Sequence, residues 1–360
     1  MFVGAEAILR DAAAAGAFPA GACEVGRHDR VLWREAIGRL TYEPDAPETD
    51  EDTIFDLASL TKVIATSTLF MRAVDDGLLR LEDRVADWIP EWRGQDRADV
   101  TLADLLAHCS GLTAYLPFYR DYTGRAEFQP AIATLPLEYT PRTTSIYSDL
   151  GFMLLAFIIE DARARQTPAA AAGAFDPSAA FSAQFRRVAS LVSDQPLCFN
   201  PPRRLRERIA PTEHDPWRGR TLVGEVHDEN AWALGGAAGH AGLFGTATAV
   251  GAFARATLHT LRGNAVLAKP ETLQSFVQRP SVPGSSRALG WDTMLPTSSC
   301  GTRMSPTAIG HTGFTGTSLW IDWERDVYVV LLTNRVHPTR HFDSGILGLR
   351  RAVGDLVNED

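Results

Sequence analysis

Two residues of this 360-residue chain, Ser59 and Lys62, carry side chains that could act together chemically. They lie three positions apart, and residues i and i+3 of a helix share one face. A serine hydroxyl is a weak nucleophile until a neighbouring base takes its proton, and a neutral amine can be that base. The spacing therefore predicts a serine nucleophile, Ser59, with Lys62 as its base partner.

Lys62 can accept a proton only when its amine is neutral, so its surroundings decide whether it can serve. The usual lysine pKa is about 10.4, and lowering it to about 7 costs roughly 4 kcal/mol. The stretch that follows, VIATSTLFMRAV, is apolar or small on nearly every side, which predicts a buried helix from about Ser59 to Asp76. Burial disfavours the charged amine, and so does the positive end of a helix that begins at Ser59. We therefore expect a lowered pKa for Lys62.

A chance occurrence of the pair is the alternative interpretation, because a serine and a lysine at this spacing are common. In that case Ser59 is a helix cap and Lys62 lies on the surface. The apolar sequence after Lys62 argues against a surface position. Lysine is also rare in this chain: only Lys62 and Lys269 occur among its 35 basic residues, so a catalytic lysine has few other candidates.

Strand-like sequences lie near both ends of the chain, and helical sequences lie between them. Strands are expected from Gly21 and Arg30 and over AIGHT, TSLWID and VYVVLLTN, with helices over about 4–16 and 345–357. This distribution predicts an α/β (α+β) fold, in which an antiparallel sheet is flanked by the terminal helices and a mostly helical region is inserted. The predicted sheet domain comprises residues 1–58 and 240–360. The predicted helical domain comprises 59–239, with a loop-rich insertion at about 165–225 and a cleft between the domains.

Two further motifs follow Ser59-Leu60-Thr61-Lys62 in order: Tyr147-Ser148-Asp149 and His311-Thr312-Gly313. With them the chain resembles the penicillin-recognising serine hydrolases, whose motifs are S-x-x-K, Y-x-N and K/H-T-G. It is most similar to the class C β-lactamase-like group, which includes DD-peptidases, D-aminopeptidases and class VIII-type esterases. The resemblance implies a β-lactamase/transpeptidase-like fold. Supporting stretches are LLAHCSGL at 105–112, YSDLGFMLL at 147–155, GHAGLFGTA at 239–247 and LTNRVHPTR at 332–340.

The resemblance also implies a role for each matched residue. Ser59 would form an acyl-enzyme, and Lys62 and Tyr147 would share the proton transfers. The backbone N–H groups of Ser59 and Phe314 would form the oxyanion hole. The implied substrate-binding residues are Asp149, His311, Thr312 and Gly313.

Two positions depart from the motifs and bear on the substrate. Asp149 stands where many relatives have asparagine, and a carboxylate can only accept hydrogen bonds and adds negative charge. His311 replaces lysine, and we expect it to be only partly charged at neutral pH and to hold a substrate carboxylate less firmly. This pattern favours a hydrolase of esters or amides, either an esterase or a D-amino-acid peptidase. The alternatives are a true β-lactamase, a penicillin-binding sensor that is acylated without turnover, and an inactive scaffold.

Composition narrows the range of partners. The net charge of −9 argues against nucleic acid or an anionic membrane, so the expected partner is a small ester, amide or peptide. The polar segment from Glu225 to Glu229, with Glu213 to Asp215, could bind a metal, but H-E-x-x-H is absent and we expect a loop near the cleft mouth instead. We expect no metal and no cofactor. The oligomeric state stays open, and the four scattered cysteines predict free thiols: Cys23, Cys109, Cys198 and Cys300.

The N-terminal residues predict an amphipathic helix. They show no basic segment followed by an apolar one, so we expect a cytoplasmic protein, or a periplasmic or secreted one if a leader precedes this sequence. No apolar run reaches the length needed to span a membrane.

Overall fold

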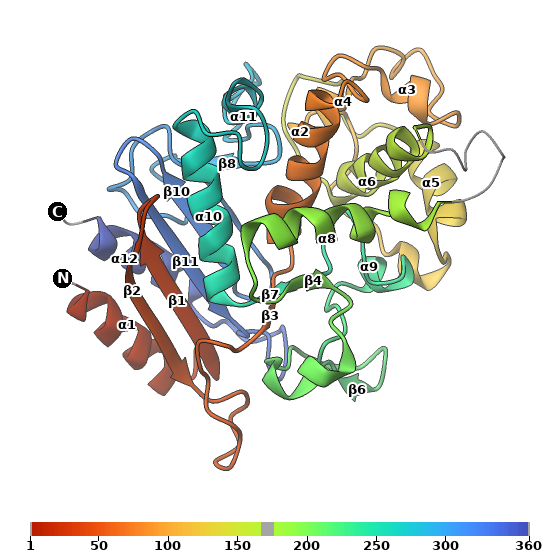
Figure 1. Cartoon of the computed structure of the whole chain (residues 1–360). Helices are drawn as coiled ribbons and strands as arrows, with labels where there is room; N and C mark the ends of the chain where they lie inside the picture. The colour runs from red at the N-terminus through yellow and green to blue at the C-terminus, as the bar shows by residue number, and fades with distance from the viewer. Residues whose placement is uncertain (1, 167–175, 359–360) are drawn as a thin grey trace.

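A six-stranded antiparallel sheet, formed by both ends of the chain, makes up one side of the molecule in the computed structural model, which describes residues 2–166 and 176–358 (Figure 1). Its strands lie in the order β2-β1-β11-β10-β9-β8. This arrangement confirms the expected fold class. The strand bounds are β1 Ala20–Gly26, β2 Val31–Gly38, β8 Asp292–Thr293, β9 Ile309–Thr312, β10 Ser318–Asp322 and β11 Val327–Thr333.

Helices cover both faces of this sheet. Helix α10 (Ala247–Leu261) packs on β1 and β11, while α1 (Val3–Ala14) and α12 (Ile346–Val357) pack together on the opposite face (Figure 1). Every residue of β1, β10 and β11 is therefore buried. This explains why these strands are almost continuously apolar instead of alternating.

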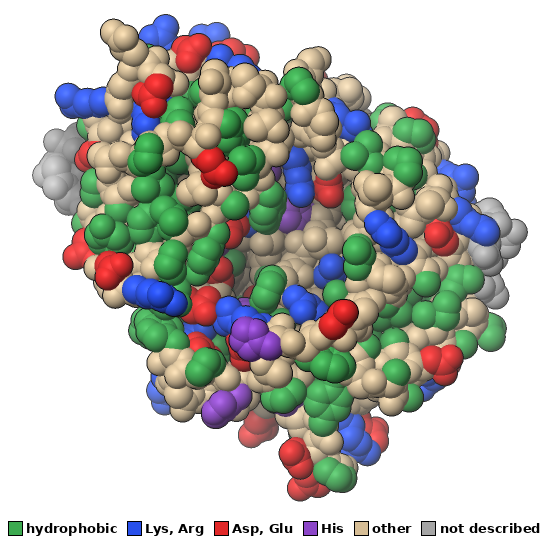
Figure 2. Space-filling model, turned by 180° about the vertical axis from the view of Figure 1, so that it is seen from behind, with side chains coloured by type: hydrophobic (Ala, Val, Ile, Leu, Met, Phe, Trp, Pro, Cys, Tyr) green, Lys and Arg blue, Asp and Glu red, His purple; other side chains and the backbone are tan. Residues whose placement is uncertain are grey.

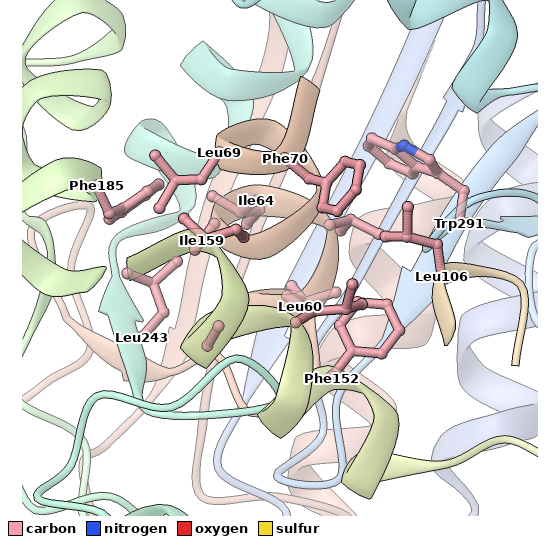
Figure 3. Packing of buried hydrophobic residues seen from close by; sticks show 14 of the residues in the cluster. Leu60, Ile64, Leu69, Phe70, Leu106, Phe152, Ile159, Phe185, Leu243 and Trp291 are labelled. Atoms are coloured by element: carbon pink, nitrogen blue, oxygen red, sulfur yellow. The ribbon is translucent and has the colours of Figure 1, made fainter. Parts of the chain in front are cut away.

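The second half of the molecule is mostly helical and is arranged around α6 (Asp149–Ala164), which is buried from Leu150 to Ile159. Apolar side chains from α6, from the helical segment that begins at Leu60, and from Leu106, Phe185 and Leu243 fill its core (Figure 3). The other helices described are α2 Thr68–Asp75, α3 Val85–Trp88, α4 Leu102–Leu106, α5 Arg125–Ala133, α8 Phe181–Val192, α9 Glu229–Ala233 and α11 Pro270–Phe276, with short helical turns η2 Phe118–Arg120, η3 Pro177–Ala179 and η4 Arg203–Arg208.

Two small sheets accompany the large one. Strands β3 (Phe55–Asp56), β7 (Leu243–Gly245) and β4 (Leu197–Phe199) form one, and β5 (His214–Asp215) pairs with β6 (Arg220–Thr221) in another. The loop-rich insertion predicted at 165–225 thus contains α8 and several short strands, while part of its alanine-rich stretch, 167–175, lies outside the described residues. The division into two domains remains a prediction. None of the described helices is long and apolar enough to cross a membrane.

The helix predicted from Ser59 to Asp76 is not an α-helix over its whole length. Residues Lys62–Ser67 form a π-helix, η1, which continues into α2. Thr68 bonds through its side chain to the Val63 carbonyl five residues earlier, and Thr66 bonds to the carbonyl of Gly239. These contacts favour the wider turn, which recurs at functional sites in proteins. A sequence that is apolar on all sides does not distinguish a π-helix from an α-helix, so the π-helix could not be predicted.

A buried asparagine ties the end of β11 to two distant segments. The Asn334 side chain donates to the carbonyls of Leu40 (3.0 Å) and Pro211 (2.9 Å) and accepts from Ala20 N (2.9 Å). Asn334→Ala leaves these groups without partners, so we expect the free energy of unfolding to fall by about 3 kcal/mol in urea denaturation. Asn264→Ala, at an exposed position, should change it by less than about 0.5 kcal/mol. Equal stability of the two variants would contradict the structural role of Asn334.

Candidate active site

A sharp turn between β3 and η1 presents Ser59. Ala58 adopts a left-handed conformation (φ +46°), which is costly for a residue with a side chain. The buried Asp56 carboxylate stabilises the turn by accepting from Ala58 N (2.8 Å) and from His227 N (2.7 Å). Burial raises the pKa of Asp56, and the two N–H groups oppose that effect only in part. Asp56 therefore links the turn before Ser59 to the loop that contains His227.

The segment after β9 packs directly against this turn. Thr315 donates to the Asp56 carbonyl (2.7 Å), and Thr317 donates to the Leu57 carbonyl (3.0 Å). A Cβ atom at Gly313 would lie 2.6 Å from the Leu57 carbonyl oxygen, so only glycine permits this approach. As a result, Phe314 lies at the same cavity as Ser59.

That cavity, the catalytic pocket, has a volume of about 310 Å³. On the face opposite to that of Figure 1, the surface is hollowed near its centre, with Lys or Arg and His side chains around the hollow (Figure 2). The catalytic pocket is lined by Ala58, Ser59, Tyr115, Tyr147, Asp149, His227, Asp228, Glu229, Ala241, Phe314 and Arg340. Residues 227–229 thus lie at the pocket, as expected of the polar loop.

Lys62 is completely buried beneath Ser59, and its ammonium has several partners. Its Nζ donates to Ser59 Oγ (3.0 Å) and to the His240 carbonyl (3.1 Å). The same atom lies 2.7 Å from Asp149 Oδ1 and 4.7 Å from the centre of the Tyr147 ring. The structure therefore brings together the four side chains that the first two motifs supplied.

The charge state of Lys62 differs from the sequence-based expectation. Burial lowers the pKa of Lys62, but the adjoining Asp149 carboxylate and Tyr147 raise it, and the net pKa is raised. The expected lowered pKa is therefore wrong, and Lys62 is an ammonium ion at neutral pH. The reason is Asp149: a carboxylate next to a buried amine stabilises its charged form, which an asparagine cannot do.

Tyr147 is held between several rings and cations. Burial raises the pKa of Tyr147, with the Lys62 ammonium opposing, so the phenol is neutral at neutral pH. Its buried hydroxyl lies near Lys62 and Ser59, and both of these neighbours lower the pKa of Tyr147 in part. Its ring lies 4.7 Å from the His108 ring and 5.6 Å from the His311 ring, while the Arg287 guanidinium lies 4.8 Å from its centre.

The third motif lies on β9 beside Tyr147. His311 is 3% exposed, and its Nδ1 lies 2.8 Å from the Thr312 carbonyl. Burial lowers the pKa of His311 well below its usual value, and Arg287 and Lys62 lower it further. The expectation of a partly charged His311 is therefore wrong: its imidazole is neutral at neutral pH.

Several residues at this site were not anticipated from the sequence. Arg287 follows a Pro- and Ser-containing loop, and no pattern around it signals a role. Asp56 and Tyr115 likewise carry no local signal, whereas Arg340 ends the stretch LTNRVHPTR without being singled out there. His108 and His240 make structural contacts, His108 Nδ1 accepting from Ser148 N (3.0 Å) and His240 Nε2 lying 2.8 Å from Asp228 Oδ1. Within the described residues, no three His, Cys, Asp or Glu side chains are placed to hold a metal ion.

Comparisons with known proteins agree with this geometry. The family model described as Beta-lactamase matches residues 5–352. The chain belongs to the beta-lactamase family. A protein of Salmonella gallinarum (strain 287/91 / NCTC 13346) named "Putative D-alanyl-D-alanine carboxypeptidase" is 33% identical over 323 residues, covering 79% of this chain and 70% of that protein. The chain is therefore a serine hydrolase of esters or amides in the beta-lactamase family.

Solved structures share the fold at lower identity. EstCE1, "a hydrolase with promiscuous acyltransferase activity", superposes with a TM-score of 0.73 at 20% identity, covering 97% of each chain. A class C beta-lactamase superposes with a TM-score of 0.75 at 16% identity, covering 100% of this chain and 96% of that one. At these identities the likeness establishes the fold alone.

We propose that the buried ion pair provides the route for the Ser59 proton. Asp149 can take a proton from the Lys62 ammonium across 2.7 Å, and the neutral amine can then take the proton of Ser59 across 3.0 Å. A charged Lys62 with a charged Asp149 and a neutral Lys62 with a neutral Asp149 bind the same total number of protons. The equilibrium between these two states therefore does not depend on the pH of the solution. Exclusion of water by a bound substrate favours the neutral pair, because it removes the solvation of both charges.

Asp149→Asn tests this route through the pH dependence of acylation. The variant cannot accept the ammonium proton, so Lys62 must lose it to water, and we expect the acid limb of kcat/KM to move to higher pH. If Tyr147 acts as the base instead, removal of the Asp149 charge lowers the pKa of Tyr147 and moves that limb to lower pH. A shift to lower pH would therefore contradict the route. Asp161→Asn, farther along α6, is the matched control and should leave the profile unchanged.

Proposed function

We propose that this enzyme cleaves small peptides and esters whose leaving group carries a free carboxylate, a carboxypeptidase-type reaction through an acyl-enzyme on Ser59. The observation that carries the proposal is Arg287. Its guanidinium lies over Tyr147, beside His311, and within the described part of the chain no acidic side chain pairs with it. Arg287 itself is not among the lining residues, but Tyr147, over which its guanidinium lies, lines the catalytic pocket. An unpaired guanidinium is suited to bind a carboxylate through two hydrogen bonds.

The neighbouring groups leave this task to Arg287. His311 is neutral, so the third motif supplies no cation for a substrate carboxylate. Asp149 cannot bind one either, because its side chain is itself a carboxylate, paired with Lys62. A substrate carboxylate near Tyr147 would therefore be held by Arg287 and kept apart from Asp149. The Salmonella relative named as a carboxypeptidase supports the same substrate class.

The proposed acylation uses the residues around Ser59 in defined roles. Ser59 Oγ forms a bond to the substrate carbonyl while the bond to the leaving group breaks. The N–H groups of Ser59 and Phe314 stabilise the oxyanion. The Ser59 proton moves to Lys62 as Lys62 passes one to Asp149, and neutral Tyr147 donates a proton to the departing nitrogen or oxygen. Tyr147 then regains a proton from Lys62, which recovers its own from Asp149. In deacylation a water molecule attacks the acyl carbonyl and gives its proton to Lys62 as Lys62 passes one to Asp149, while Tyr147 donates a proton to the departing Ser59 oxygen; the same return of protons restores the resting site.

Ester hydrolysis with apolar acyl groups is a second candidate, supported by the walls of the catalytic pocket. Tyr115 and Phe314 are 40% and 52% exposed there, and such rings favour a short apolar group. The description of EstCE1 as a hydrolase with acyltransferase activity agrees with this candidate. Ester hydrolysis of this kind requires no carboxylate on the leaving group.

Arg287→Ala distinguishes the two candidates. With an N-acylated D-amino-acid dipeptide, we expect KM for the free carboxylate form to rise at least tenfold, because a charged hydrogen bond is lost. The carboxamide form of the same dipeptide should be unaffected, and Arg186→Ala, on the exposed face of α8, should affect neither. Ser59→Ala should abolish both activities. Equal effects of Arg287→Ala on the two forms would contradict carboxylate recognition and favour the second candidate.

A further inference from the structure

A second cavity, the outer pocket, adjoins the catalytic pocket and has a volume of about 660 Å³. Glu229 and Arg340 line both cavities, and their side chains form an ion pair of 2.8 Å. A ligand longer than the catalytic pocket can therefore extend past this ion pair. The other residues that matter for binding in the outer pocket are Tyr119, Arg120, Trp217 and His341.

The outer pocket exposes an indole that is held in place. Trp217 is 45% exposed, although the rings of Tyr119 and Trp232 pack against it edge to face at 4.6 Å and 5.3 Å. The Arg218 guanidinium packs against both indoles and pairs with Asp215. These contacts fix the indole before any ligand arrives, so little conformational freedom is lost on binding.

Hydrogen-bond donors and a hydrogen-bond acceptor surround the Trp217 indole. Arg120 is exposed; its guanidinium interacts with Tyr119, and among the described residues it forms no ion pair with an acidic side chain. The His341 imidazole is also exposed. One oxygen of the Glu229 carboxylate is bonded to Arg340, which leaves the other as an acceptor. The pocket therefore offers donors and an acceptor beside an apolar ring.

We propose that the outer pocket binds a pyranose sugar. One face of such a ring consists of C–H groups, which pack on an indole, while its hydroxyls both donate and accept hydrogen bonds. A hydrocarbon chain would desolvate Arg120 and Glu229 without giving them partners, which is unfavourable. A simple anion would make no use of Trp217. The proposal does not depend on which bond Ser59 cleaves.

Binding is measured by calorimetry and by tryptophan fluorescence on the full chain carrying Ser59→Ala, which prevents turnover. The probes are maltotriose, cellotriose and triacetylchitotriose, with decanoate and inorganic phosphate as non-sugar probes. We expect at least one trisaccharide to bind more tightly than either non-sugar probe. Adding Trp217→Ala or Arg120→Ala should weaken that binding at least tenfold. Trp33→Ala, on β2 far from the pocket, removes a tryptophan as a matched control and should leave it unchanged.

Three results would overturn the proposal: no binding of any trisaccharide at millimolar concentration, undiminished binding in both pocket variants, or tighter binding of decanoate. Arg120 is exposed, so its variant keeps the test valid if Trp217→Ala does not fold. Wild-type turnover is measured separately. Retained sugar binding without hydrolysis would count against the proposed function alone.

Discussion

The ion pair between Lys62 and Asp149 is the interaction on which the chemistry of this site depends. A buried ammonium is unfavourable without a partner, and a carboxylate at 2.7 Å supplies one. The pair fixes the Lys62 side chain under Ser59 and sets its charge at the same time. In the proposed route the amine becomes neutral by giving its proton to Asp149, which differs from the usual expectation of a lysine base that is already neutral.

This pair exists because three separate segments meet at one point: the stretch from Asp56 to Ser67, the start of α6 and the segment after β9. Asp56 and the left-handed Ala58 orient the turn at Ser59, and the π-helix begins at Lys62 directly below it. Asp149 lies in the first turn of α6. The β9 segment closes on the same turn, and only a glycine at position 313 allows that approach. The site thus requires the large sheet and the helical half to be packed together.

The sequence was sufficient to predict that Ser59 and Lys62 lie together, the strands at both ends and the buried helical segment after Ser59, because each of these has a local pattern. The role of Ser59 as nucleophile stays a prediction. The sequence was insufficient to predict the π-helix. That helix depends on the Thr66 hydroxyl donating to the carbonyl of Gly239, far away in the chain, and on the Thr68 hydroxyl donating to the carbonyl of Val63, five residues earlier. The charge of Lys62 was predicted wrongly because burial was considered without the partner that burial brings near. The role proposed for Arg287 arises only from its position over Tyr147, to which no local pattern points.

The protonation state of Lys62 can be measured directly, since the chain contains only one other lysine, Lys269. Protein labelled with ¹³C at the lysine side chains gives two Cε signals, and Lys269→Arg assigns the one that belongs to Lys62. We predict that the Lys62 signal keeps the chemical shift of a charged amine from about pH 6 to about pH 10, because its pKa is raised. A titration of that signal near neutral pH would show that Lys62 is a free base in the resting enzyme and would contradict proton transfer through the Lys62–Asp149 ion pair.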